Sequence, residues 1–296
     1  MKNLTWTADF FPRSGQYHIY HFYGDKDKTV IQVRDDSATS IDPVKYTYHT
    51  RPYNSINIVF EVKNITLKDA GYYGGGTSQI AARSGSGVVL VVKGKPTKPE
   101  IRGTMNSTEN SDFSLTCTSQ STSRPSYYSK TVSLNYIWYR NNTVIDSETK
   151  MTLRFPRISR DVRFNKYSCQ SKESIVSEES EEIQINVLYG PNSVAITPQL
   201  PVHKTVSVKN GDYIGPYNCQ ADCNPPCTIQ WNYKLSNGTF REAKSNGSTL
   251  LQQRVFRDQV LFRCVARSTY DKLLHTPIIL YIRCKNFIVN TFMKHI

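Results

Sequence analysis

The sequence has no apolar run long enough to cross a membrane as a helix. Its longest apolar runs, at residues 88–92 and 277–282, are strand-sized and fall far short of the roughly 20 residues that a membrane helix needs. No stretch repeats apolar residues at helical spacing, which disfavours a mainly helical fold. Residues 2–6 contain no signal-peptide core, so we expect that a signal was removed or that the recorded start is incomplete.

Motifs of catalysis and cofactor binding are also missing. There is no Gly-x-Ser-x-Gly nucleophile elbow and no legible Ser/His/Asp arrangement. The run of Gly74, Gly75 and Gly76 has no phosphate-binding lysine after it, so we interpret it as the close-packed end of a strand. We therefore expect no enzyme, no catalytic residue and no cofactor.

The net charge of +13 raises the question of polyanion partners. Lysine and arginine are spread along the chain, and no nucleic-acid-binding motif appears. We expect a solvated basic surface and no nucleic acid partner, with acidic glycans as the alternative.

What is present favours strands in several domains. The chain has 296 residues, 19 of them tyrosine, and its Val, Ile and Leu runs are short. Lysine and proline alternate at residues 93–99, and a Tyr-Gly-Pro turn follows another apolar strand at residues 189–191. These boundaries predict domains at residues 1–94, 95–189 and 190–283, followed by a tail at residues 284–296.

The second unit has a characteristic order of cysteine, tryptophan and tyrosine. Cys117 ends an alternating apolar stretch, Trp138 follows in the next apolar stretch, and Tyr167 precedes Cys169 by two positions. This order resembles an immunoglobulin domain, where a disulfide joins two sheets, the indole packs on it and the tyrosine hydroxyl fixes a corner. The resemblance implies a Cys117 to Cys169 disulfide.

The third unit repeats the order with Cys219, Trp231 and Cys264, and the resemblance implies a Cys219 to Cys264 disulfide. Phe262 stands at the tyrosine position, so the ring fills the volume without the corner hydrogen bond. The Tyr-Gly-Pro turn and the Cys219-Gln-Ala-Asp stretch are similar to tandem domains of carcinoembryonic-antigen-related adhesion molecules, sialic-acid-binding immunoglobulin-type lectins and hemicentin-like proteins. This resemblance covers residues 99–283 and implies recognition at a cell surface or after secretion.

The first unit departs from the pattern. Residues 69–75 read Asp-x-Gly-x-Tyr-x-Gly, with Gly75 where a cysteine is expected, and Trp6 stands at the partner position. We interpret Trp6 as the side chain that fills the space of the missing disulfide. The prediction is an all-β chain of three tandem immunoglobulin-like β-sandwiches, the first V-like and without the disulfide. Asp69, Asp161 and Asp258 lie in the stretches before the second-cysteine positions, and each is expected to form a structural salt bridge.

Three further cysteines remain. Cys223 and Cys227 flank two prolines, and we expect a small local disulfide between them. The alternative is a metal site made by these two thiols with Cys219 and Cys264, although the spacing is not that of a typical zinc site. Cys284 is the odd thiol and opens the tail.

Cysteine usage and sequons predict an extracellular location, either secreted or as the ectodomain of a membrane protein. Candidate glycosylation sites are Asn3, Asn64, Asn106, Asn141, Asn237 and Asn246.

We expect the main binding surface to lie in the first unit. A predicted strand carries Tyr17, Tyr20, Phe22 and Tyr23, and alternation should leave at least one of these aromatic rings outward as a binding residue. We expect adhesion or immune-type recognition of protein partners, homophilic contact included. A lectin for sialic acid or heparan-type glycans is the alternative, although Arg83 lies several residues beyond the position that sialic-acid-binding relatives use.

Overall fold

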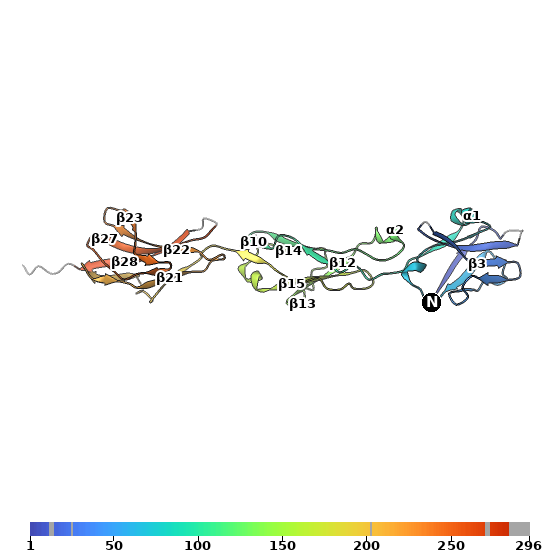
Figure 1. Cartoon of the computed structure of the whole chain (residues 1–296), viewed down its shortest axis with the longest axis horizontal. Helices are drawn as coiled ribbons and strands as arrows, with labels where there is room; N and C mark the ends of the chain where they lie inside the picture. Colours follow the sequence, from blue (N-terminus) through green and yellow to red (C-terminus); the bar gives the residue numbers. More distant parts are fainter. Residues whose placement is uncertain (12–14, 25, 202, 270–272, 284–296) are drawn as a thin grey trace, which may run out of the picture. The chain divides into compact units, whose positions relative to one another are not determined.

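The computed structural model describes residues 1–11, 15–24, 26–201, 203–269 and 273–283. Within them the chain forms three tandem immunoglobulin-like β-sandwiches, so the predicted fold class is confirmed (Figure 1). The predicted domain boundaries stay predictions. The tail at residues 284–296, with Cys284, lies outside the described residues.

The residues group into two compact units. The first comprises Met1–Thr104, Ser114–Phe155 and Asn165–Gln184, and the second comprises Met105–Phe113, Pro156–Phe164 and the chain from Ile185 onward. The first sandwich belongs to the first unit, the third sandwich to the second unit, and the second sandwich has strands in each.

The first sandwich consists of two antiparallel sheets, with strand orders β1-β6-β5 and β4-β3-β2-β7-β8. Strands β3 and β4 beside β2 give the larger sheet the composition of a variable-type domain. The elements are β1 (Lys2–Thr7), β2 (Gln16–Tyr23), β3 (Lys26–Arg34), β4 (Ala38–Ser40), β5 (Tyr46–Tyr48), β6 (Asn57–Val62), η1 (Leu67–Asp69), β7 (Gly71–Gly76), α1 (Gln79–Ser84) and β8 (Gly87–Leu90).

Alternation of side chains builds the core of this sandwich. In β6, Ile58, Phe60 and Val62 point inward and are fully buried, while the residues between them are exposed or partly exposed. Each such side chain contributes about 1.5–3 kcal/mol through removal of apolar surface from water. The two sheets are therefore held together by apolar packing and without a disulfide.

Tyr73 and Asp69 fix the corner before β7. The Tyr73 hydroxyl donates a hydrogen bond to Asp69 O at 2.8 Å, as in the tyrosine corner of immunoglobulin domains. The Asp69 carboxylate accepts hydrogen bonds from Lys45 Nζ at 2.7 Å and Thr66 N at 2.6 Å, so the expected salt bridge is confirmed. Burial alone would raise the pKa of Asp69, but these hydrogen bonds hold it below its usual value.

Replacing Lys45 by methionine is expected to destabilise the first sandwich at neutral pH and to matter less in acid. The folded state holds the pKa of Asp69 below the unfolded value of 3.8. Stabilisation by the carboxylate is therefore present above that value and is lost as the pH falls through the folded pKa. Hydrogen exchange of peptides from β5 and β7, corrected for the pH dependence of intrinsic exchange, compares Lys45→Met with the parent chain from about pH 2 to about pH 7. Lys68→Met, at an exposed lysine of η1, is the control. A difference that does not shrink in acid would contradict this assignment.

The second sandwich contains the sheets β14-β11-β9 and β13-β12-β15-β16 and a parallel pair of β10 with β17. Its elements are β9 (Glu100–Arg102), β10 (Asn106–Thr108), β11 (Phe113–Thr118), α2 (Ser126–Ser129), β12 (Asn135–Arg140), β13 (Thr143–Val144), β14 (Thr152–Phe155), η2 (Arg160–Phe164), β15 (Lys166–Lys172), β16 (Ile183–Gln184) and β17 (Asn186–Leu188).

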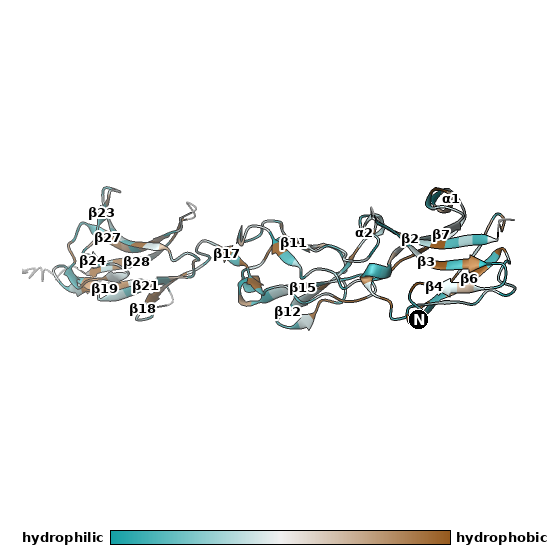
Figure 2. Ribbon diagram, turned by 45° about the vertical axis from the view of Figure 1, so that its right-hand side comes forward, coloured by the Kyte–Doolittle hydropathy of each residue, from teal (hydrophilic) through white to brown (hydrophobic). Residues whose placement is uncertain are grey.

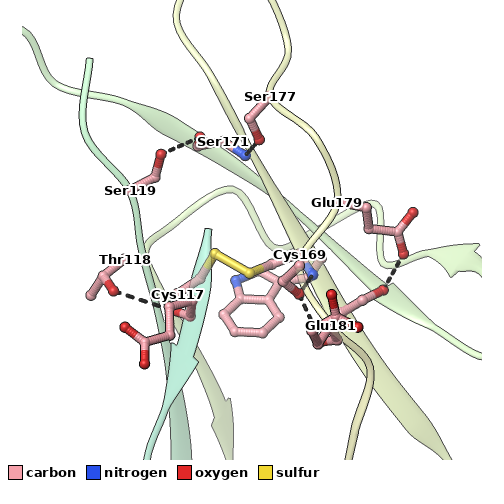
Figure 3. Close-up of a disulfide and its surroundings, with 12 residues drawn as sticks. Cys117, Thr118, Ser119, Cys169, Ser171, Ser177, Glu179 and Glu181 are labelled. Carbon is pink, nitrogen blue, oxygen red and sulfur yellow. Dashed lines mark hydrogen bonds between the residues drawn. A yellow bond between two sulfur atoms is a disulfide. The ribbon is translucent and has the colours of Figure 1, made fainter. Parts of the chain in front are cut away.

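A disulfide joins Cys117 of β11 to Cys169 of β15 (Figure 3). The fully buried Trp138 pairs across the sheet with Cys169. Beyond the short ladder of β15 with β16, two serine hydroxyls accept hydrogen bonds from backbone N–H groups of β15, in place of backbone carbonyls. Ser177 Oγ accepts from Ser171 N at 2.9 Å, and Ser180 Oγ accepts from Cys169 N at 3.0 Å. These side chains satisfy buried backbone donors where the regular ladder is interrupted.

The third sandwich contains the sheets β18-β21-β25-β24 and β19-β28-β27-β22-β23 and the pair β20-β26. Its elements are β18 (Val194–Thr197), β19 (Thr205–Lys209), β20 (Tyr213–Ile214), β21 (Tyr217–Ala221), β22 (Thr228–Leu235), β23 (Phe240–Glu242), β24 (Ser245–Asn246), β25 (Thr249–Leu250), β26 (Gln253–Arg254), β27 (Gln259–Arg267) and β28 (Leu273–Arg283).

Two disulfides stabilise this sandwich. Cys219 is bonded to Cys264 and Cys223 to Cys227, so none of these four thiols is free to bind a metal. Trp231 pairs across the sheet with Cys264, which repeats the arrangement in the second sandwich. Among the residues that the structure describes, no helix has the length and apolar character needed to span a membrane.

Candidate functional site

The aromatic residues expected to be open on β2 are mostly covered. Tyr17, Tyr20 and Phe22 are 3%, 6% and 8% exposed, and only Tyr23 keeps partial exposure. Tyr17 belongs to the core between the sheets. Tyr20 and Phe22 point away from that core, as alternation predicts, but they pack against the fully buried Ala82 of α1. Tyr20 and Phe22 thus point outward from the core but are not open to solvent, because a short helix covers them. A binding role for the four aromatic residues stays a prediction.

Helix α1 lies directly on strand β7 (Figure 2). A β-carbon at Gly74 would come within 2.3 Å of Ala82 O, and one at Gly76 within 2.7 Å of Ala82 N. Only glycine leaves room for this approach, which supports the interpretation of the glycine run as a close-packed strand end. The Tyr72 hydroxyl donates to Gly85 O at 2.8 Å and fixes the end of the helix.

Tyr17, rather than Trp6, occupies the space beside Gly75. A β-carbon at Gly75 would lie 2.0 Å from the Tyr17 hydroxyl oxygen, so this phenol fills the position that a cysteine sulfur would take. Trp6 is partly exposed and packs edge-on against Phe60, with ring centroids 5.8 Å apart. The interpretation that Trp6 fills the space of the missing disulfide is therefore wrong, because Tyr17 fills it.

Burial raises the pKa of Tyr17 to about 12, so its hydroxyl is neutral at physiological pH. The nearby Trp6 side chain opposes part of this rise, although its indole N–H has no acceptor in good hydrogen-bond geometry. The Tyr17 hydroxyl is thus a neutral polar group held next to the backbone of β7.

A cavity of about 220 Å³ opens between the end of β1, the end of β7 and α1. It is lined by residues 8–10, Tyr17, residues 75–77, Ala81 and residues 84–86. Within the cavity wall, Ser86 Oγ donates to Asp9 Oδ1 at 2.9 Å. Among the described residues that line the cavity, none is a lysine, arginine or histidine, and Asp9 is the charged one.

The strand register places this cavity at one end of the sandwich. The chain passes from Thr7 at the end of β1 to Gln16 at the start of β2, and Gly76 at the end of β7 pairs with His18. The connections at residues 8–15 and 77–86 therefore leave the sandwich together. In antibody variable domains the equivalent connections are loops that bind antigen. We refer to the described parts of these two connections as the loop end.

Two exposed apolar side chains stand at the loop end. Phe10 is 66% exposed and lines the cavity, and Ile80 on α1 is 82% exposed. They come from the two different connections. Sequence reasoning missed this site, because the six-residue helix that carries Ile80 shows no periodicity and a lone phenylalanine in a loop has no characteristic spacing.

The side-chain amides predicted as glycosylation sites are all on the surface. Each of the six residues is exposed, namely Asn3, Asn64, Asn106, Asn141, Asn237 and Asn246. Glycosylation at these positions stays a prediction. In the first sandwich, Asn3 lies on β1 and Asn64 follows β6, so both belong to the smaller sheet and its connection rather than to the loop end.

Comparison with known proteins agrees with the fold. Residues 98–187 match the model of the immunoglobulin domain family. The titin I-band fragment I67–I69 is 17% identical, with 97% of this chain and 100% of that chain covered and a TM-score of 0.45. The insect immune protein hemolin is 13% identical, with 95% and 72% covered and a TM-score of 0.40. The four N-terminal Ig domains of a Dscam1 isoform are 14% identical, with 95% and 66% covered and a TM-score of 0.41.

These similarities are distant, at 13–17% identity. They are similarities to chains of tandem immunoglobulin domains, and they do not single out carcinoembryonic-antigen-related molecules or sialic-acid-binding lectins.

Proposed function

We propose that this chain is an extracellular recognition protein that binds protein partners through the loop end of its first sandwich. The proposal is carried by two exposed apolar residues, one from each connection of the loop end: Phe10, which lines the cavity, and Ile80, which precedes the lining residue Ala81 on α1. Single exposed apolar residues are ordinary, but two from separate loops around a concavity supply the apolar centre that protein interfaces use.

The disulfides support an extracellular location. Three of them are present among the described residues, and such bonds persist in oxidising compartments. Glycans at Asn3 and Asn64 would extend from the smaller sheet and its connection and would leave the loop end open for a partner.

The glycan-binding alternative has weaker support at this site. Arg83 is the basic residue nearest the position that a lectin of this type would need. Its guanidinium already pairs with Asp27 and stacks over the Phe22 ring at 4.8 Å. An anionic sugar would have to compete with both contacts.

Replacing Ile80 by arginine in the full chain is expected to lower binding to partner-bearing cells at least tenfold, about 1.4 kcal/mol. The change places a charge at the apolar centre of the contact and leaves the buried side of α1 intact. Val44→Arg is the matched control, because Val44 is 75% exposed and lies at the other end of the sandwich. It is two residues before Tyr46, which pairs with Val62, and Val62 also pairs with Lys2, at the end of β1 away from Thr7 and the loop end.

Flow cytometry with fluorescently labelled protein measures both variants, and a glycan array at physiological and raised salt tests the alternative. Equal binding by Ile80→Arg and Val44→Arg would contradict the proposal. Salt-resistant glycan binding that Ile80→Arg leaves unchanged would favour the lectin instead.

A further inference from the structure

The cavity at the loop end has the size of one side chain. Pockets for drug-sized ligands run from about 300 to 1,000 Å³. The volume here, about 220 Å³, is smaller and is open to solvent beside Phe10. A group that enters it would therefore be a single long side chain on a larger partner, rather than a whole small molecule.

The glycine strand forms one wall of this space. Because Gly75 and Gly76 carry no side chain, Tyr17 and α1 approach β7 closely, and the neutral Tyr17 hydroxyl lies in the same wall. Helix α1 rests on the same strand and forms another wall with Ala81 and Ser84. The cavity thus lies between the packed end of β7 with α1 and the described residues of the two connections.

The charge of the wall favours a cation. Asp9 contributes one carboxylate, of which Oδ1 accepts the Ser86 hydroxyl. Ser84 and Tyr17 add hydroxyl oxygens, and none of the described residues that line the wall is basic. Within a chain of net charge +13, the described lining of this cavity thus has an acidic residue as its one charged group.

Several acceptors around one carboxylate suit arginine better than lysine. The guanidinium is planar and has five N–H donors, whereas an ammonium is a compact, strongly hydrated charge. The exposed Phe10 ring at the rim can also stack on a guanidinium, a contact worth about 0.5–1 kcal/mol at exposed sites.

The geometry points to a site for an arginine side chain of the partner protein, with Asp9 as its counter-ion and Phe10 as its stacking surface. This assignment rests on the proposed function in that the arginine belongs to a protein partner. The contact would place the guanidinium next to Phe10, one of the two exposed apolar residues of the proposed interface.

The test uses small probes, so that it does not require the partner. The full chain, labelled with ¹⁵N, is titrated with N-acetyl-arginine amide and, separately, with the uncharged isostere N-acetyl-citrulline amide. Arginine is expected to shift the backbone amide signals of residues 75–77 and 84–86 saturably at millimolar concentration, and citrulline to bind at least tenfold more weakly. Equal binding of the two probes, or no shift at these amides, would overturn the assignment.

Asp9→Asn is expected to weaken arginine binding at least tenfold. Asp36→Asn is the control, because this exposed carboxylate follows β3 at the same end of the sandwich and is absent from the cavity wall. Equal loss in both variants would mean general charge attraction and would overturn the assignment. Arginine binding that persists while Ile80→Arg still binds cells normally would instead refute the proposed function and leave the cavity site standing.

Discussion

Replacing Tyr17 by alanine is expected to destabilise the first sandwich by about 3–5 kcal/mol, the usual loss for a large buried aromatic side chain. Tyr17 is 3% exposed, and its ring lies beside Gly75, where the other two sandwiches have a cystine. Trp6→Ala is the matched change on the facing sheet. It is expected to cost less, because Trp6 is partly exposed and packs at the edge of the core.

Hydrogen exchange of peptides from β2 and β7 in the full chain measures this difference, because a global melting curve would mix three sandwiches. A larger loss of protection in Trp6→Ala than in Tyr17→Ala would show that the indole fills the space of the disulfide after all.

A coupled pair of changes tests the same packing from the opposite side. Gly75→Ala alone should be destabilising by about 1–3 kcal/mol, since its β-carbon would lie 2.0 Å from the Tyr17 hydroxyl. Adding Tyr17→Leu removes the phenol atoms that this β-carbon would meet. The free energy of unfolding of the double variant should therefore be higher than the sum of the two single effects predicts. Strict additivity would contradict the contact.

The two disulfides of the third sandwich should differ in their contribution to stability. Removing Cys219 and Cys264 as a serine pair is expected to cost about 4 kcal/mol, and removing Cys223 and Cys227 about 2 kcal/mol, from the loop-closure entropy of the unfolded chain. The reason is the sequence separation, 45 residues for the first pair and 4 for the second.

Denaturant unfolding of the two double variants, followed through hydrogen exchange in β27, measures these losses. Equal losses would contradict the entropic account. Stoichiometric zinc retained by the parent protein after purification without chelators would contradict the local Cys223 to Cys227 bond itself.

The sequence predicts the parts of this fold that depend on local pattern. The positions of Cys117, Trp138 and Cys169 suffice for the two-sheet arrangement of the second sandwich, because alternation sends all three side chains inward. In the first sandwich, Tyr73 occupies the tyrosine position of the pattern at residues 69–75, and its hydroxyl donates a hydrogen bond to Asp69 O. Phe262 is fully buried, as expected for a ring that fills the corner volume.

The sequence does not predict which of several neighbouring side chains fills a given space in the folded sandwich. Trp6 and Tyr17 both qualify as fillers opposite Gly75, and the length and direction of the side chain decide between them. Helix α1 covers Tyr20 and Phe22, but it has only six residues and its sequence shows no helical periodicity that would predict it. The cavity at the loop end arises from that helix and could not be predicted without it.

The central claim is that the loop end of the first sandwich contacts a protein partner, and site-specific photo-crosslinking on intact cells tests it most directly. A benzophenone-bearing amino acid replaces Phe10 in one full-length variant and Phe164 of the second sandwich in another. The two phenylalanines are matched, since they are 66% and 69% exposed. The account predicts a protease-sensitive adduct from position 10 that excess unlabelled chain competes away, and no such adduct from position 164. A competed adduct from position 164 alone, or equal adducts from both positions, would contradict it.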